Sequence, residues 1–121
     1  RLHCVQAKSV MPVAAAYRGQ NWDISCLKPT IAGGIAVAIP PRLHQVIQVL
    51  QKSGGTAITV SEEEIGCWHT YLPANEGVFA EPTSAAAFAG AEKLVESGII
   101  RAGSRILIPV TGFGLKDFSP V

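Results

Sequence analysis

A hydroxyl and two glycines follow directly after the most apolar short run of the chain. Ile106 to Val110 contains only apolar residues, and Thr111, Gly112 and Gly114 come next. Glycine lets a backbone turn sharply and approach a ligand closely. In open α/β sheets, ligands bind outside the carboxyl ends of the strands. These residues are therefore a candidate ligand-binding loop, although an ordinary turn from a strand into a loop would have the same spacing.

Other residue patterns that could do chemistry lack a necessary partner. A dinucleotide-binding fingerprint would need a third glycine at position 117, which is Asp117, and no phosphate-binding Walker loop occurs. Nucleophilic catalysis has candidates in Cys4, Cys67, His69 and Ser84, but no elbow motif surrounds any of them. We therefore assign no catalytic residue and no metal ligand from motifs.

Ser61 and the three carboxylates after it mark the start of a helix. Ser61 can cap the helix, and Glu64 can reach back to the N–H of Ser61, as in a capping box. Glu62, Glu63 and Glu64 also suit the positive end of the helix dipole. Acid–base catalysis or metal binding would be the functional alternative, but capping alone accounts for these side chains.

The composition is that of one apolar domain with almost no net charge. The 121 residues are 48% hydrophobic and 16% charged, whereas an average globular domain has about 25% charged residues. Such a chain either buries much of itself or exposes an apolar face to a partner. Ten basic and nine acidic residues without a basic stripe give no indication of nucleic-acid binding. We expect a single domain over residues 1–121.

The cysteines bear on the cellular location of the protein, and the first residue bears on whether the chain is complete. Cys4, Cys26 and Cys67 are odd in number and widely spaced, which favours reduced thiols in a cytoplasmic protein over disulfides or zinc. Neither a signal peptide nor a membrane-spanning stretch is apparent, so no membrane partner is expected. The chain begins at Arg1 instead of Met, and we therefore expect a piece of a longer protein.

Strands and helices are expected to alternate around the candidate loop. Leu43 to Ser53 is the best-marked helix, with apolar residues at helical spacing and Gly54 just past its end. The helix expected after Glu81 is rich in alanine and should pack closely against a sheet. The remaining expectations are strands over 2–7, 56–60 and 106–110, and helices over 11–17 and from Ser61 to near Pro73.

This order predicts an α/β fold with three αβα layers and a small, mostly parallel sheet, joined by right-handed crossovers. Because the run from Ile106 to Val110 is apolar on both faces, it predicts a strand that is buried on both faces. Pro109 counts against a central strand here, since proline donates no hydrogen bond to a neighbouring strand. A sheet of three or four short strands has an open edge, which suggests that a partner piece is absent.

Two stretches resemble a known enzyme family. They are EGVFAEPTSAAAFAG (Glu76 to Gly90) and ESGIIRAGSRILIPVTGFGLKD (Glu96 to Asp117). Both are similar to the C-terminal part of the threonine synthases, which are fold-type II enzymes dependent on pyridoxal 5′-phosphate (PLP). The family pattern is EG-x-F-x-EP-[AT]-SAA, followed by a strand that ends in TG-x-GLKD. HCVQA, PTIAGGIAV and SGGTAITVSEEEI also resemble the family, so the similarity covers nearly the whole chain and implies part of the large domain.

The resemblance implies chemistry on PLP in the parent enzyme. PLP acts as an electron sink, and threonine synthases use it to eliminate phosphate from O-phosphohomoserine and add water, which gives threonine. Thr111 matches the hydroxyl that faces the pyridine nitrogen, which a neutral group would leave largely unprotonated. Gly112 and Gly114 match the turn beside the ring. Three further matches lie near the cleft of the large domain without an assigned role: Glu81, Ser84 and Thr30.

The chain departs from the family pattern where the cofactor is anchored. The family's PLP-bearing lysine and its loop for the cofactor phosphate lie in an N-terminal segment that this sequence does not contain. The five lysines present stand in other contexts: Lys8, Lys28, Lys52, Lys93 and Lys116. We expect the chain alone to bind no PLP, to be inactive, and to self-associate through apolar surface that the missing half would cover.

Two other interpretations stay open. TIAGGIAV and SEEEI would equally suit a serine or threonine dehydratase, and a cysteate synthase-like enzyme is a further PLP-dependent alternative; the ending TGFGLKD favours threonine synthase. The other interpretation is a stand-alone α/β binding or assembly domain without catalysis.

Overall fold

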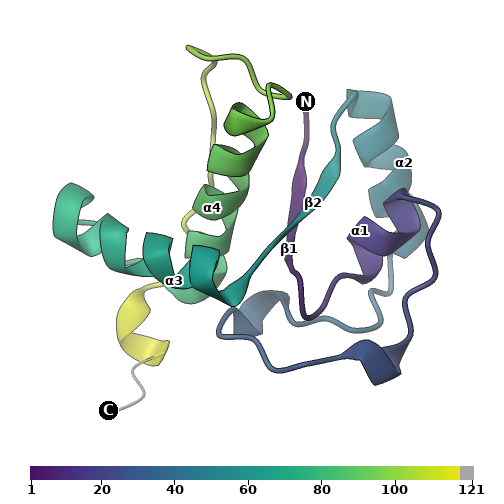
Figure 1. Cartoon of the computed structure of the whole chain (residues 1–121), viewed down its shortest axis with the longest axis horizontal. Helices are drawn as coiled ribbons and strands as arrows, with labels where there is room; N and C mark the ends of the chain where they lie inside the picture. The colour runs from purple at the N-terminus through teal and green to yellow at the C-terminus, as the bar shows by residue number, and fades with distance from the viewer. Residues whose placement is uncertain (118–121) are drawn as a thin grey trace.

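Short strands and helices alternate along the chain (Figure 1). The computed structural model describes residues 1–117. Its strands are β1 (Cys4–Ala7) and β2 (Ala57–Val60), and its α-helices are α1 (Pro12–Tyr17), α2 (Leu43–Ser53), α3 (Glu62–Tyr71) and α4 (Pro82–Glu96). Single turns of other helix types cover Ile24–Cys26, Gly33–Ile35, Leu72–Glu76 and Gly114–Asp117. All four expected helices and the first two expected strands are thus confirmed.

The two strands form a small parallel sheet between helices. Cys4 pairs with Ala57 and Ala7 pairs with Val60, so the register runs without interruption. Figure 1 shows α1 and α2 on one side of the strands and α4 on the other, and both α1 and α4 contact both strands. The expected α/β class with three layers is confirmed. Within residues 1–117 the sheet has two strands, fewer than the three or four expected.

One half of the core lies between the strands and the helix pair α1 and α2. Its buried residues are Val13, Ala14, Leu50 and Ala57. α2 ends where Gly54 adopts a φ of 67°, in the left-handed region that glycine tolerates best. The buried Gln6 accepts a hydrogen bond of 3.0 Å from the N–H of Ala14, which satisfies a free donor in the first turn of α1.

The other half of the core lies between the strands and α4 and is made of small side chains. Its buried residues are Ala7, Ala32, Val60, Ile65, Ala85, Ala86 and Ala89. Gly90 packs directly on β1, because a Cβ atom at this position would lie 2.3 Å from a methyl carbon of Val5. The close packing expected of the alanine-rich helix is therefore confirmed.

α3 begins with the expected capping box. Ser61 Oγ accepts a hydrogen bond of 3.2 Å from the N–H of Glu64, and the Glu64 carboxylate accepts one of 2.6 Å from the N–H of Ser61. The same carboxylate forms an ion pair of 2.8 Å with Lys93 of α4. Glu62 differs, because its side chain accepts a hydrogen bond of 2.9 Å from the N–H of Ile31. It thereby fastens a distant loop to the start of α3.

The apolar run before the candidate loop is not a strand, so this expectation was wrong. Within residues 1–117, Ile106 to Val110 has neither a strand partner nor a backbone hydrogen bond. Leu107 is 92% exposed. A buried strand requires neighbouring strands that take its backbone hydrogen bonds. β1 and β2 pair with each other instead, and the run returns along α4 without a neighbour of this kind (Figure 1).

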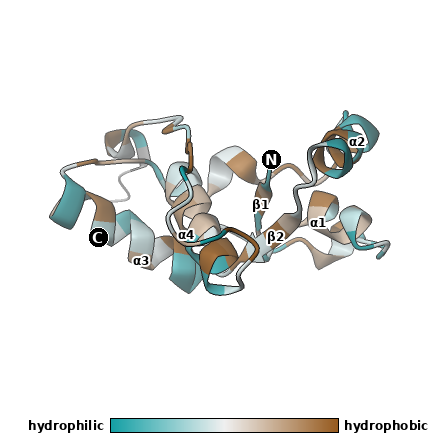
Figure 2. Cartoon of the chain, turned by 90° about the horizontal axis from the view of Figure 1, so that it is seen from above, coloured by the Kyte–Doolittle hydropathy of each residue, from teal (hydrophilic) through white to brown (hydrophobic). Residues whose placement is uncertain are grey.

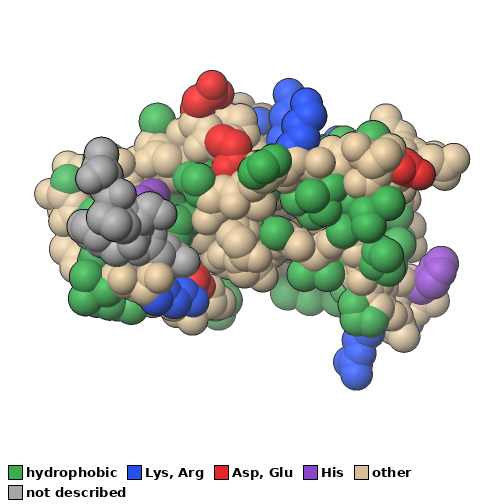
Figure 3. All heavy atoms as spheres, turned by 90° about the horizontal axis from the view of Figure 1, so that it is seen from below, with side chains coloured by type: hydrophobic (Ala, Val, Ile, Leu, Met, Phe, Trp, Pro, Cys, Tyr) green, Lys and Arg blue, Asp and Glu red, His purple; other side chains and the backbone are tan. Residues whose placement is uncertain are grey.

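Much apolar surface remains exposed. Figure 2 shows hydrophobic residues on segments outside the packed centre as well as within it. On the face seen in Figure 3, hydrophobic side chains cover more area than charged ones. The large apolar residues most exposed to solvent are Leu2, Ile24, Ile39, Leu107, Phe113 and Leu115. None of the helices in the described part of the chain has the length and apolar character needed to cross a membrane.

Candidate functional site

The candidate loop lies against the first turn of α4. The N–H of Thr111 donates a hydrogen bond of 2.9 Å to Ser84 Oγ, and the two hydroxyl oxygens lie 3.1 Å apart. The Thr111 hydroxyl also donates a hydrogen bond of 2.7 Å to Oε1 of Glu81. Because Glu81 and Ser84 flank the beginning of α4, these contacts hold the end of the chain against the start of that helix.

Glu81 is buried, and its carboxylate serves the loop instead of the helix. It occupies the N-cap position of α4 but makes no side-chain capping hydrogen bond. Its Oε2 forms an ion pair with Lys116, and its N–H donates a hydrogen bond of 3.0 Å to the carbonyl of Gly112. A buried carboxylate needs such partners, because an unpaired charge away from water is strongly unfavourable.

These contacts hold the pKa of Glu81 below its usual value of 4.5. The hydrogen bond from Lys116 lowers the pKa most, and the hydrogen bond from Thr111 lowers it further. Burial acts in the opposite direction but is outweighed. Glu81 is therefore ionised at neutral pH, and Thr111 is the donor in the bond between them.

Gly112 and Gly114 allow the loop to lie close to its neighbours. A Cβ atom at Gly112 would lie 2.5 Å from Cδ of Glu81, and one at Gly114 would lie 2.6 Å from the ring of Phe79. The N–H of Gly114 donates a hydrogen bond of 2.9 Å to the carbonyl of Phe79. Neither glycine has a positive φ. Their small size is therefore required for close packing, and the sharp turn expected from the sequence does not depend on left-handed backbone.

The loop presents an exposed hydroxyl in front of buried polar groups. Thr111 is exposed, whereas Ser84 and Glu81 behind it are buried. With its proton donated to Glu81, Thr111 Oγ1 keeps an acceptor lone pair. Such a group can orient a polar ligand at one point. Among residues 1–117, no cluster of three or more His, Cys, Asp or Glu side chains is arranged to hold a metal ion.

Of the four nucleophile candidates, Ser84 is the one that the structure brings to Thr111. Cys4 lies on β1, where burial raises the pKa of its thiol and so reduces its reactivity at neutral pH. Cys67 lies exposed on α3, and His69 on the same helix lies beside the Phe79 ring, with 6.1 Å between ring centroids.

Thr30, which the resemblance placed near a cleft, has a local role in this structure. Its hydroxyl oxygen accepts a hydrogen bond of 3.2 Å from the N–H of Ala32, just before the turn Gly33–Ile35. The neighbouring N–H of Gly34 donates a hydrogen bond of 3.0 Å to the hydroxyl of Thr83, in the first turn of α4. Thr30 therefore orders a loop that also reaches the start of α4.

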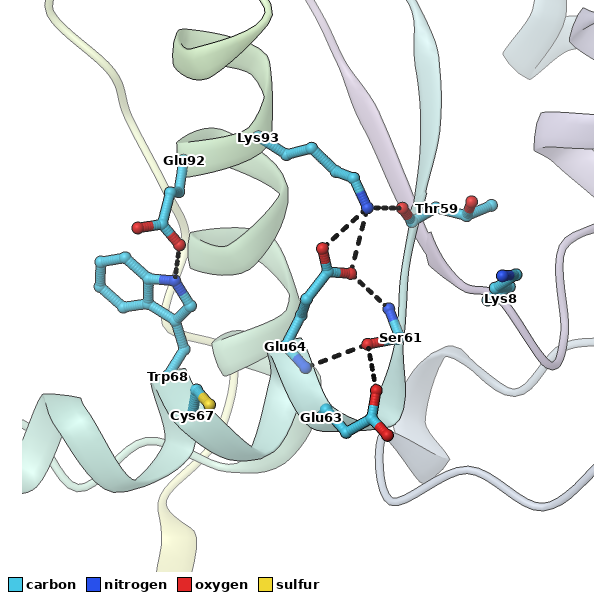
Figure 4. Close-up of a pocket in the computed structure, with 9 residues that line it drawn as sticks. All are labelled: Lys8, Thr59, Ser61, Glu63, Glu64, Cys67, Trp68, Glu92 and Lys93. Atoms are coloured by element: carbon cyan, nitrogen blue, oxygen red, sulfur yellow. Dashed lines mark hydrogen bonds and ion pairs between the residues drawn. The ribbon is translucent and has the colours of Figure 1, made fainter.

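A hollow of about 590 Å³ lies elsewhere, among β2, α3 and α4 (Figure 4). Its polar groups bind one another: Lys93 pairs with Glu64, and the indole N–H of Trp68 donates a hydrogen bond of 2.7 Å to Glu92. No residue of the candidate loop lines it; the lining residues are Lys8, Thr59, Ser61, Glu63, Glu64, Cys67, Trp68, Glu92 and Lys93. We therefore regard these contacts as structural.

Two residues of the site were not assigned from the sequence. Glu81 matched a family position without a role, and Lys116 was set aside because it stands outside the context of a PLP-bearing lysine. The structure joins them in an ion pair beside Thr111. An acidic residue before one helix and a lysine five positions after Thr111 were the available signals, but their pairing spans 35 positions and has no local pattern.

Comparison with known proteins decides the family. The family model described as pyridoxal-phosphate dependent enzyme matches residues 1–112. This chain belongs to the pyridoxal-phosphate dependent enzymes. Thr111 and Gly112 lie inside the matched region, and Gly114 lies just beyond it.

Several members of this PLP-dependent family are similar over most of the chain. Threonine synthase from Methanocaldococcus jannaschii is 39% identical over 115 residues, which are 93% of this chain. Threonine synthase from Halalkalibacterium halodurans is 40% identical over 88 residues, or 73% of this chain. The chain spans only 28% and 25% of these two relatives, about a quarter of their length. The expected resemblance to threonine synthases is confirmed.

A solved structure of another enzyme has the same fold. A crystal structure of a T.th. threonine deaminase superimposes with a TM-score of 0.65, and the match covers 98% of this chain and 41% of that one. Sequence identity is 22%, so this likeness concerns the fold alone. The fold assignment from the sequence is thereby supported, including the membership in fold-type II of the PLP-dependent enzymes.

The described residues offer one group that could contact PLP, the exposed Thr111 hydroxyl. While this hydroxyl donates its proton to Glu81 it can only accept a hydrogen bond, so it would donate to an unprotonated ring nitrogen only after it releases Glu81. Lys93 and Lys116 are both engaged in ion pairs with carboxylates. The assignment of Thr111, Gly112 and Gly114 to the cofactor stays a prediction.

Proposed function

We propose that this chain is the C-terminal part of a threonine synthase, a PLP-dependent lyase. The whole protein would convert O-phosphohomoserine and water into threonine and phosphate. The observation that carries the proposal is the 39% identity to a threonine synthase over 93% of this chain. When bound, PLP would supply the electron sink for the reaction. This chain would supply one wall of the site.

In this proposal Thr111 contacts the pyridine nitrogen, while Gly112 and Gly114 let the loop pack closely on Glu81 and Phe79, just before α4. Glu81 positions the hydroxyl by accepting its proton in a bond of 2.7 Å, and Lys116 balances the charge of Glu81. In this arrangement the hydroxyl offers an acceptor lone pair outward. To donate a hydrogen bond to an unprotonated ring nitrogen, as the resemblance implies, it would have to release Glu81.

The chain alone is proposed to be inactive, to bind no PLP, and to self-associate. The exposed apolar residues near its C-terminal end, Leu107 and Phe113 among them, support self-association, because such surfaces tend to be covered. Three free thiols are compatible with the proposed cytoplasmic location.

Expression of the complete reading frame that contains this sequence tests the reaction. We expect phosphate release from O-phosphohomoserine with matching formation of threonine. Deamination of serine or threonine without that reaction would support the dehydratase alternative. A native product that starts near Arg1 and shows neither reaction would support a non-catalytic binding domain.

The role of Thr111 is tested in the same complete protein by two substitutions. Thr111→Val removes the hydroxyl and keeps the shape, and we expect a PLP dissociation constant raised by about tenfold, the effect of one lost hydrogen bond. Thr111→Ser keeps the hydroxyl and should bind PLP nearly as the wild type does. Equal affinity of all three proteins for PLP would contradict the assignment.

A further inference from the structure

Glu62, the first residue of α3, binds two segments that are distant from it in the chain. Its Oε1 accepts a hydrogen bond of 3.1 Å from the hydroxyl of Ser9, in the loop after β1. Its Oε2 accepts one of 2.9 Å from the N–H of Ile31, in the loop between α1 and α2. Hydrogen bonds to a carboxylate are stronger than those between neutral groups. Helix capping explains the contacts of Glu64, but it does not explain these two contacts of Glu62.

Glu62 lies at the edge of the sheet where both strands end. β1 ends at Ala7, β2 ends at Val60, and the two strands are parallel. Ser9 and Glu62 therefore leave the sheet at the same edge. The chain between α1 and α2 passes below this edge in Figure 1. Because ligands of open α/β sheets bind outside the carboxyl ends of the strands, Glu62 fastens this part of the chain where a ligand is expected.

Residues 30–36, which we call segment 30–36, have a second anchor on α4. The N–H of Gly34 donates a hydrogen bond of 3.0 Å to the hydroxyl of Thr83, and a Cβ atom at Gly34 would lie 2.7 Å from that oxygen. Ala32 of the same segment is fully buried in the core. The residue after Thr83 is Ser84, whose hydroxyl binds Thr111. Consecutive residues in the first turn of α4 thus hold segment 30–36 and the candidate loop.

We propose that Glu62 is a positioning residue of the PLP site, which it serves by holding segment 30–36 beside the candidate loop as a second wall. Glu62 itself contacts no ligand. The segment has room for one, since Gly33 is exposed and a Cβ atom there would meet nothing within 4 Å. The inference rests on the proposed function, because it assigns Glu62 to the same site.

A segment that is held in place in advance costs a ligand less to bind. Without Glu62, segment 30–36 would keep its contacts at Ala32 and Gly34 but would lose the one at Ile31. An amino-acid substrate would then have to order the segment as it binds, and this ordering lowers its affinity. The proposal therefore predicts an effect on substrate binding that is larger than any effect on the chemical step.

Three variants of the complete protein isolate this role. Glu62→Ala removes both acceptor oxygens. Glu62→Gln keeps the size of the side chain and offers an oxygen to the N–H of Ile31 and an N–H to the hydroxyl oxygen of Ser9. Glu63→Ala is the matched control, because it removes a carboxylate from the same first turn of α3. Glu63 is exposed, and its hydrogen bond from Ser61 Oγ is long, at 3.4 Å.

Hydrogen exchange without substrate tests the contact itself. We expect the amide of Ile31 to exchange at least about tenfold faster in Glu62→Ala than in wild type, because its acceptor is gone. Glu62→Gln and Glu63→Ala should exchange this amide as the wild type does. Equal exchange of the Ile31 amide in Glu62→Ala and wild type would overturn the proposal, since Glu62 would not hold the segment.

Steady-state kinetics of the complete protein with PLP test the positioning role. The substrate is O-phosphohomoserine, or serine or threonine if the protein turns over one of these instead. We expect Glu62→Ala to raise KM about tenfold and to change kcat by less than about twofold, as a loss of uniform binding does. Glu62→Gln should restore KM to within about twofold of wild type, and Glu63→Ala should match wild type.

Other outcomes would overturn the role of Glu62. Lower thermal stability of Glu62→Ala with an unchanged KM would assign a purely structural role to Glu62. Equal effects of Glu62→Ala and Glu63→Ala on KM would assign the effect to the helix terminus, and a Glu62→Gln variant as impaired as Glu62→Ala would exclude hydrogen bonding as the cause.

Failure of the proposed function has a different signature. Turnover of serine or threonine in place of O-phosphohomoserine would refute the proposed reaction, while the comparison of KM values would still decide the role of Glu62. A complete protein that neither binds PLP nor turns over any of these substrates would overturn the proposed function and the site that Glu62 is proposed to position.

Discussion

The hydroxyl of Thr111 donates a hydrogen bond of 2.7 Å to the buried carboxylate of Glu81, 30 positions earlier in the chain. The bond joins the loop after α4 to the residue before α4. Lys116 binds the second oxygen of the same carboxylate. One buried charge thereby fixes both ends of the loop, and the orientation of the Thr111 side chain depends on it.

Replacement of Glu81 by glutamine should destabilise the chain more than the same change on the surface. Glu81→Gln removes the charge that binds Thr111 and Lys116 but keeps the size of the side chain. We expect a loss of about 1.5–3 kcal/mol in the free energy of unfolding, the range for hydrogen bonds to a charged group. Glu96→Gln, at an exposed position of α4, is the control and should be nearly neutral. Urea unfolding measures both, and equal midpoints for the two variants would refute this role of Glu81.

Stability should fall in acid partly through Glu81. Its pKa in the folded chain lies below the usual value of 4.5, first because of Lys116 and then because of Thr111. In acid the unfolded chain therefore binds more protons than the folded one. The contribution of Glu81 is complete above about pH 4.5 and is lost as the pH falls through the folded pKa.

Urea unfolding at pH 7 and at pH 3 checks this sign. The wild type should lose more stability between the two pH values than Glu81→Gln does. Glu64 also adds to the pH dependence of the wild-type stability. Burial raises its pKa, but the hydrogen bonds from Lys93 and Ser61 outweigh burial and hold the pKa below its usual value. If the wild type and Glu81→Gln lose equal stability between pH 7 and pH 3, the ion pair of Glu81 with Lys116 does not form in solution.

Gly112 should not tolerate a methyl group. A Cβ atom there would lie 2.5 Å from the carboxylate carbon of Glu81, which cannot move aside without leaving Thr111 and Lys116. Gly112→Ala is therefore expected to cost about 1–3 kcal/mol, as overpacking does. Gly66→Ala is the matched control, because its Cβ would meet nothing within 4 Å on α3. It should stabilise by about 0.5–1 kcal/mol through helix propensity. Thermal unfolding of both variants measures the change in stability that each causes. If Gly66→Ala is also destabilising, the effect of Gly112→Ala cannot be assigned to its close packing on Glu81.

The parts of the fold that local chemistry determines could be predicted from the sequence. The capping box of Ser61 and Glu64 uses residues three positions apart, and α2 shows its apolar stripe within eleven residues. The close packing of α4 followed from its alanines, because small side chains allow close approach in any context. These features depend on neighbours in the chain, and the structure confirms them.

The parts that depend on distant partners could not be predicted. Ile106 to Val110 has the composition of a strand, but a strand exists only where other backbone takes its hydrogen bonds. The role of Glu81 was hidden for the same reason, since Thr111 and Lys116 lie 30 and 35 positions away. The sequence identified the loop from its hydroxyl and glycines and from family motifs, whereas the network behind the loop joins residues that lie far apart in the chain.

The lysines of the isolated chain should not form a defined PLP adduct. Lys93 donates hydrogen bonds of 2.8 Å to Glu64 and 3.2 Å to the carbonyl of Thr59, and Lys116 is paired with Glu81. An ammonium group held in an ion pair is a poor nucleophile, because its nitrogen is engaged with the carboxylate. Treatment with PLP and borohydride should therefore give substoichiometric labelling spread over several lysines, as measured by intact mass and peptide mapping.

The variant Glu81→Gln refines the same experiment. Because it removes the carboxylate that binds Lys116, labelling of Lys116 should rise relative to wild type, while labelling of Lys28 should not change. Complete labelling of a single lysine in the wild-type chain would contradict the prediction that this chain lacks the cofactor's anchor. A rise at Lys28 equal to that at Lys116 would instead indicate general loosening of the fold, and the ion pair would not be the cause.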